Sequence, residues 1–77
     1  MIVEELLVIL KEINGEIDYS KEKHLVDDGL FVSFDIIQCV SECEEHFDIE
    51  IPPEAIVAEN FQSAEAIWHM IEVVQKG

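Results

Sequence analysis

Ser33 carries the best-placed nucleophilic hydroxyl of the sequence, because it follows a Gly-containing loop and begins a predicted amphipathic helix. A serine there commonly caps the helix by accepting a backbone N–H bond, and the local pattern alone favours this interpretation. The free N–H groups and positive dipole end of a helix also tolerate a phosphodiester, so Ser33 could instead attach a phosphate-linked group. A catalytic nucleophile is not indicated, because Ser33 lies outside any G-x-S-x-G motif and His24 falls in a loop.

The helix predicted over residues 33–47 carries large apolar side chains on the face opposite its core stripe. Most charged faces are simply solvated, but Phe34 and Ile37 stand next to Ser33 among acidic and polar residues. Apolar side chains ringed by acids favour a docking surface for a partner with a basic patch and an apolar socket. The residues predicted for this surface are Phe34, Asp35, Ile37, Gln38, Ser41, Glu44 and Glu45.

Metal sites are weakly indicated. Cys39, Cys43 and His46 could line one side of a helix, but structural zinc takes four ligands. Both cysteines fall on the predicted core face, where a free Cys behaves as a small hydrophobe. Their Cβ atoms, about 5–6 Å apart on a helix, are too distant for an unstrained disulfide. An EF-hand beginning at Asp18 fails at its glycine and glutamate positions.

Length and charge restrict the class of protein. The chain has 77 residues, which predicts a single domain over 1–77 that buries only about 60% of its unfolded surface. That size favours a binding or carrier module over an enzyme. With 18 acidic against 4 basic residues, the surface repels nucleic acid and anionic membranes and attracts basic protein patches.

The same features predict a cytoplasmic monomer. No apolar run reaches the length of a membrane span, and no signal peptide is visible. A net charge of -14 disfavours self-association.

Added salt or magnesium is expected to raise the melting temperature, because the net charge of -14 destabilises the folded state by self-repulsion. Melting curves at low and high salt check this expectation. Identical curves would contradict it.

Hydrophobic periodicity predicts three main helices. The first runs over residues 2–13 and ends at Asn14-Gly15, where Gly suits a left-handed cap. The second runs over 33–47, and the last begins after a capping Ser63. The expected core stripes are Ile2, Leu6, Leu10 and Ile13, then Ile36, Cys39, Val40, Cys43 and Phe47, then Ala64, Ile67, Ile71 and Val74 with Trp68 at the edge.

Two connections join these helices. A long loop spans residues 15–32 and should be anchored by apolar side chains. A short helix is predicted from Pro53 to Val57, followed by a connector over 58–62. The expected loop anchors are Ile17, Tyr19, Leu25, Val26 and Leu30.

Residues 28–34, Asp-Gly-Leu-Phe-Val-Ser-Phe, resemble the attachment motif of acyl carrier proteins. That family has a Gly three or four residues before the modified Ser and an apolar residue directly after it. Residues 44–52 resemble the end of the family's second helix, and residues 60–63 with the closing amphipathic helix also fit. The resemblance covers the whole chain, including its length and its acidity.

The resemblance implies an all-α fold, a four-helix up-down bundle with three main helices and one short helix. It implies that a phosphopantetheinyl transferase attaches 4′-phosphopantetheine from coenzyme A to Ser33. The arm's thiol would hold acyl or aminoacyl groups as thioesters, loaded by a ligase and passed to synthase or transferase enzymes. The protein itself would be a carrier and not an enzyme.

Two alternatives stay open. Residues 29–30 and 33–34 resemble D-alanyl carrier proteins of teichoic acid synthesis as much as carriers of fatty acid biosynthesis. An acidic helical interaction module without a prosthetic group is the alternative of a different class.

One position departs from the family pattern. The family usually has Asp directly before the modified Ser, where this chain has Val32, so a specialised transferase could be needed.

Overall fold

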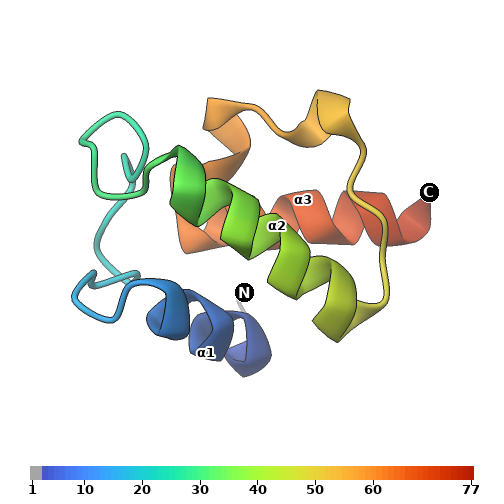
Figure 1. Cartoon of the computed structure of the whole chain (residues 1–77), viewed down its shortest axis with the longest axis horizontal. Coiled ribbons are helices and arrows are strands. Elements are labelled where there is room, and N and C mark those ends of the chain that lie inside the picture. The colour runs from blue at the N-terminus through green and yellow to red at the C-terminus, as the bar shows by residue number, and fades with distance from the viewer. Residues whose placement is uncertain (1–2) are drawn as a thin grey trace.

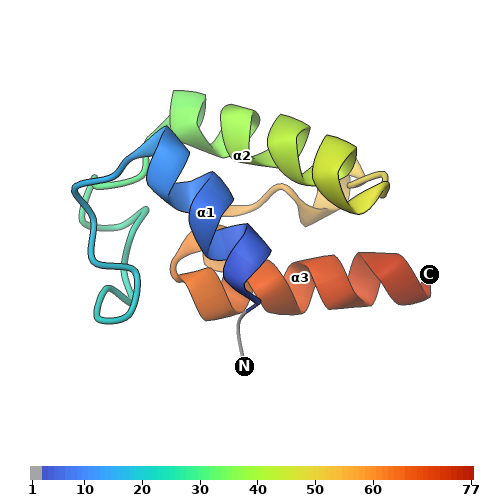
Figure 2. The same cartoon turned by 90° about the horizontal axis from the view of Figure 1, so that it is seen from below.

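A computed structural model describes residues 3–77, whose regular secondary structure is helical without any strand. This confirms the predicted all-α class. Helix α1 runs opposite to α2 and α3, and α2 lies across α3 (Figures 1 and 2). The α-helices are α1 (Glu4–Ile13), α2 (Ser33–Phe47) and α3 (Ala64–Lys76), and the 3-10 helices are η1 (Pro53–Ala55) and η2 (Ala58–Phe61).

The segment after α2 returns the chain to the start of α3, since these two helices point the same way (Figure 1). Helix α2 ends as predicted at Asp48, which has a left-handed backbone with φ 54°. The short helix begins at Pro53 as predicted, but it ends at Ala55 and is of the 3-10 type. The Asn60 side-chain amide donates a hydrogen bond to the Ala55 carbonyl at 2.7 Å, so the last carbonyl of η1 has a partner. The predicted connector over 58–62 was wrong in part, because it contains η2.

The predicted stripes of α1 and α3 contribute buried residues to the core. The segments between the α-helices contribute as well, through Ile17, Tyr19, Leu25, Phe31, Ile51 and Phe61. Helix α2 contributes less than predicted. Only Cys39 and Cys43 of its stripe are fully buried, whereas Ile36, Val40 and Phe47 are half-buried. The two thiol sulfurs lie 3.9 Å apart without a disulfide. The hydrogen bond to Cys43 and burial raise the pKa of the Cys39 thiol, so it behaves as a core group. Five predicted stripe residues of α1 and α3 are buried: Leu6, Leu10, Ala64, Ile67 and Ile71. Met70 of α3 is also buried, although it was not predicted. Three predicted residues are half-buried, namely Ile13, Trp68 and Val74, and Ile2 lies outside the described residues.

The C-terminal end of α1 is capped differently from the prediction. Gly15 was expected to take a left-handed conformation, but the chain leaves the helix through an extended Asn14. The hydroxyl of buried Tyr19 lies 2.8 Å from both the Leu10 and the Asn14 carbonyl oxygens and donates into this pair. Because a side chain from the following loop satisfies the helix end, no left-handed residue is needed.

Unfolding experiments should detect the buried Tyr19 hydroxyl. Burial, reinforced by nearby Asp35, raises the pKa of Tyr19 to about 12, above its usual 10.0. The folded state therefore holds the phenolic proton more tightly, and this stabilisation is complete below pH 10 and is lost as pH rises towards 12. The free energy of unfolding should fall by about 3 kcal/mol over this window.

Tyr19→Phe is the control, since its unfolding free energy should lack this component of the pH dependence. The variant should also lose about 1–3 kcal/mol at neutral pH, because the two carbonyls lose their shared donor. Ultraviolet absorbance of tyrosinate measures the titration directly, as Tyr19 is the single tyrosine. A midpoint at the ordinary value of a free phenol would contradict the buried hydroxyl.

Candidate functional site

The loop before Ser33 ends in a tight turn closed by backbone hydrogen bonds. The Leu30 and Phe31 N–H groups both donate to the Leu25 carbonyl at 2.9 Å, and the Gly29 N–H donates to the Val26 carbonyl at 3.1 Å. This 6→1 and 5→2 pattern places Gly29 in a left-handed conformation with φ 74°. The Gly of the candidate attachment motif thus has a backbone role.

The anchoring of this loop was predicted correctly at four positions and wrongly at one. Ile17, Tyr19 and Leu25 are buried, and Val26 is half-buried. Leu30 was expected to be an anchor but is 37% exposed, while its neighbour Phe31 is fully buried. Phe31, and not Leu30, therefore anchors the end of the loop.

Contacts from the start of α3 hold the loop in place. The Gln62 side-chain oxygen accepts from the Val26 and Asp27 N–H groups at 3.1 and 3.2 Å, and its nitrogen donates to the Asp27 carboxylate at 2.9 Å. The Gln62 carbonyl accepts from the Leu25 N–H at 2.9 Å. Sequence reasoning missed this clamp, because residues more than thirty positions apart give no local signal of contact.

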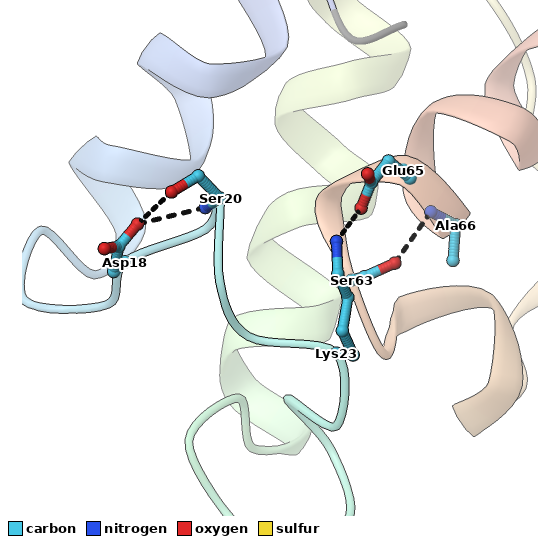
Figure 3. Close-up of polar contacts among 6 residues, drawn as sticks. All are labelled: Asp18, Ser20, Lys23, Ser63, Glu65 and Ala66. Atoms are coloured by element: carbon cyan, nitrogen blue, oxygen red, sulfur yellow. Dashed lines mark hydrogen bonds and ion pairs between the residues drawn. The ribbon is translucent and has the colours of Figure 1, made fainter.

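Two further contacts at the start of α3 are drawn in Figure 3. Lys23 and Glu65 form an exposed ion pair at 2.6 Å, and this bond lowers the pKa of Glu65. Ser63 caps α3 as predicted, since its hydroxyl accepts from the Ala66 N–H at 3.0 Å. The loop that leads to Ser33 is therefore tied to the N-terminal end of α3.

Gly29→Ala is expected to destabilise the protein by about 1–2 kcal/mol, because an L-residue with a Cβ is strained at φ 74°. The space around the glycine is open, so the cost comes from the backbone and not from a clash. Urea unfolding measures it. Gly29→Asn is the matched control, since Asn visits this conformation more readily and should cost less. Equal losses for both variants would contradict a purely conformational cause.

The start of α2 corrects the capping interpretation of Ser33. The N-cap is Val32, and its N–H donates to the Asp35 carboxylate at 3.0 Å. Ser33 is the first residue of the helix and is exposed, and its hydroxyl has no hydrogen-bond partner within residues 3–77. Asp35 thus accepts from the N-cap N–H, while Ser33 lies one position inside the helix and makes no capping bond, which leaves its oxygen available for chemistry.

The predicted docking residues divide into an exposed group and a structural group. Phe34 and Ile37 are 71% and 67% exposed, next to Ser33 on the outer face of α2, and Ser41 and Glu45 are exposed further along. By contrast, Gln38 is half-buried. So are the two acids engaged within the fold: Asp35 at Val32, and Glu44, whose carboxylate accepts from the Ile51 N–H at 2.8 Å. The exposed apolar pair is thus better placed for a partner than these two acids.

The residues considered as metal ligands do not come together in the structure. Cys39 and Cys43 lie in the core while His46 is exposed and stacks edge-on against Phe47 at 4.9 Å between ring centroids. Asp18 accepts two hydrogen bonds from Ser20, which lower its pKa and make a local turn (Figure 3). Within residues 3–77, no three His, Cys, Asp or Glu side chains converge as metal ligands would.

Comparison with known proteins gave no relative. No protein-family model matches the chain, and no curated protein or solved structure matches it. Over residues 3–77, no helix combines the length and the apolar character needed to cross a membrane.

Proposed function

We propose that the protein is an acyl carrier protein that holds acyl or aminoacyl groups as thioesters on a 4′-phosphopantetheine arm attached to Ser33. The observation that carries the proposal is the free Ser33 hydroxyl, which is exposed at the first position of α2 and makes no capping bond. An exposed serine at a helix start without a capping role has a position suited to covalent modification. The unpaired N–H groups of that helix end favour a phosphodiester.

The order and direction of the helices also support the proposal. The resemblance implied an up-down bundle with three main helices and one short helix, and the all-helical chain has three α-helices with η1 in the expected region of residues 53–57. The long loop before α2 is ordered by the Gln62 clamp and the turn at Gly29, so Ser33 is held on a fixed element. The carrier would act by presenting its cargo to successive enzymes.

Partner enzymes would dock on the exposed face of α2. Phe34 and Ile37 supply a compact apolar contact beside the attachment point, and Ser41 and Glu45 extend it. The partner would offer an apolar socket with basic residues around it, because the chain carries a net charge of -14. The cargo could be an acyl group of fatty acid synthesis or D-alanine for teichoic acid.

The experiment is incubation of the purified chain with coenzyme A and a broad-specificity phosphopantetheinyl transferase, followed by intact mass measurement. Three chains are compared: the native one, Ser33→Ala and Val32→Asp. A gain of one phosphopantetheine on the native chain or on Val32→Asp, but not on Ser33→Ala, is expected. Loading only of Val32→Asp would mean that the native chain requires a specialised transferase.

A second candidate function is an acidic helical interaction module without a prosthetic group. The observation that favours it is Val32, an exposed apolar residue at the N-cap, in the position where carriers usually have Asp. Its side chain adds to Phe34 and Ile37, so a partner could bind this surface without any modification of Ser33. Failure of loading for both the native chain and Val32→Asp would favour this module.

A further inference from the structure

A groove lies between the segment that follows α2 and the C-terminal half of α3, which pass close to each other in both views (Figures 1 and 2). Its volume is about 740 Å³, within the size range of small-molecule sites. The apolar walls are Ile51, Pro52 and Ala55 on one side and Met70, Val73 and Val74 on the other. Val73 stays 56% exposed, although it lies in this apolar wall.

The groove is separate from Ser33. Ser33 begins α2, whereas the groove is built from residues that follow the end of this fifteen-residue helix. At the helical rise per residue, the length of α2 is about 22 Å. A ligand in the groove would therefore occupy a second site at the other end of the helix.

The polar groups of the groove include several hydrogen-bond acceptors and a negative charge. Glu50 contributes an exposed carboxylate. The Asn60 amide nitrogen donates to the Ala55 carbonyl at 2.7 Å, which orients the amide and leaves its oxygen as an acceptor. His69 also lines the groove.

The C-terminal half of α3 contributes Val73 and Val74 to the groove. The exposed Lys76 of the same helix is not among the lining residues, so the charged side chain of the groove is Glu50.

We propose that this groove binds a small aliphatic amine, with its hydrocarbon body along the apolar walls and its ammonium group at Glu50. The acceptors and the Glu50 carboxylate match a cationic donor, and the same carboxylate repels a carboxylate ligand of equal length. The site does not depend on the proposed carrier function, because it uses none of the residues around Ser33.

The experiment is titration of the ¹⁵N-labelled native chain with octylamine in about 0.15 M salt, where long-range charge effects are screened. Saturable shifts at Ile51, Val73 and Val74 are expected, with a Kd of about 1 mM or tighter, which is within the efficiency of small ligands. Octanoate tests whether binding requires the positive charge, and ethylamine tests whether it requires the long hydrocarbon chain. Neither compound should give saturable shifts. Equal binding of octanoate, or shifts spread evenly over the acidic surface, would overturn the proposal.

Matched variants locate the binding. Val73→Trp should fill the groove and remove the saturable shifts, whereas Val8→Trp, at a residue 51% exposed on α1, should leave them unchanged. Glu50→Gln should weaken octylamine about two- to fivefold, as expected for one exposed charge, and Glu12→Gln should not. Unchanged binding in Val73→Trp overturns the proposal. If Val73→Trp fails to fold, unchanged binding in Glu50→Gln overturns the assignment of the ammonium group.

Discussion

Replacing Ser33 by Ala is expected to abolish loading with phosphopantetheine while changing the free energy of unfolding by less than about 0.5 kcal/mol. The small effect follows because the Ser33 hydroxyl is exposed and has no hydrogen-bond partner in the part of the chain that the structure describes. A capping serine would cost about 0.5–2 kcal/mol instead. Urea unfolding gives the first quantity and intact mass gives the second.

Asp35→Ala is the matched comparison in the same helical turn. Its carboxylate accepts from the Val32 N–H, so this variant should lose about 0.5–1.5 kcal/mol of stability and keep the attachment serine. The reverse order, with Ser33→Ala the more destabilised variant, would mean that the serine hydroxyl caps α2. Loading that persists in Ser33→Ala would exclude this residue as the attachment site.

Phe31→Ala is expected to have the largest effect on stability, about 3–5 kcal/mol, because it removes a fully buried aromatic side chain from the core. A domain of this kind has only about 5–15 kcal/mol in total, so the variant should be partly unfolded at moderate temperature. The residue also ends the turn that leads into α2, where its N–H donates to the Leu25 carbonyl. Urea unfolding of the variant measures the loss.

Phe34→Ala is the control for Phe31→Ala, since the same atoms are removed from a side chain that is 71% exposed. Its stability should change by less than about 0.5 kcal/mol, while binding of a partner on α2 should weaken. A large loss of stability at Phe34 would show that this side chain packs in the core in solution. That result would remove the main support for a docking surface beside Ser33.

The helices were predictable because their apolar residues recur with the helical period and their ends carry local signals. Helix α2 has the predicted bounds, Ser33–Phe47, since a Gly-containing loop precedes it and Asp48 takes a left-handed conformation after it. Ser63 caps α3 as its residue type and position indicate. The four-helix up-down bundle was implied by the family resemblance and not by any periodicity, and it stays a prediction.

The loop and the caps were harder to predict, because they depend on contacts between residues distant in sequence. The Tyr19 hydroxyl replaces a left-handed glycine at the end of α1, and Gln62 clamps the loop from the start of α3. A loop has no period, so adjacent apolar residues such as Leu30 and Phe31 cannot be ranked for burial.

The sequence predicted which residues of the candidate site are exposed better than it predicted what each residue does. Ser33, Phe34 and Ile37 are exposed together as expected, but Asp35 and Glu44 make hydrogen bonds within the fold. Capping statistics rank serine highly at a helix start, but they do not fix which residue is the N-cap. Val32 takes that position, and Asp35 at N3 accepts from its N–H.

The most direct test of the account is mass spectrometry of the chain after exposure to coenzyme A and a phosphopantetheinyl transferase, with fragmentation that locates the added group. The account predicts a single phosphopantetheine on the peptide that contains Ser33, in the native chain or after Val32→Asp. Addition at Ser20, Ser41 or Ser63, or no addition to either chain, would contradict it.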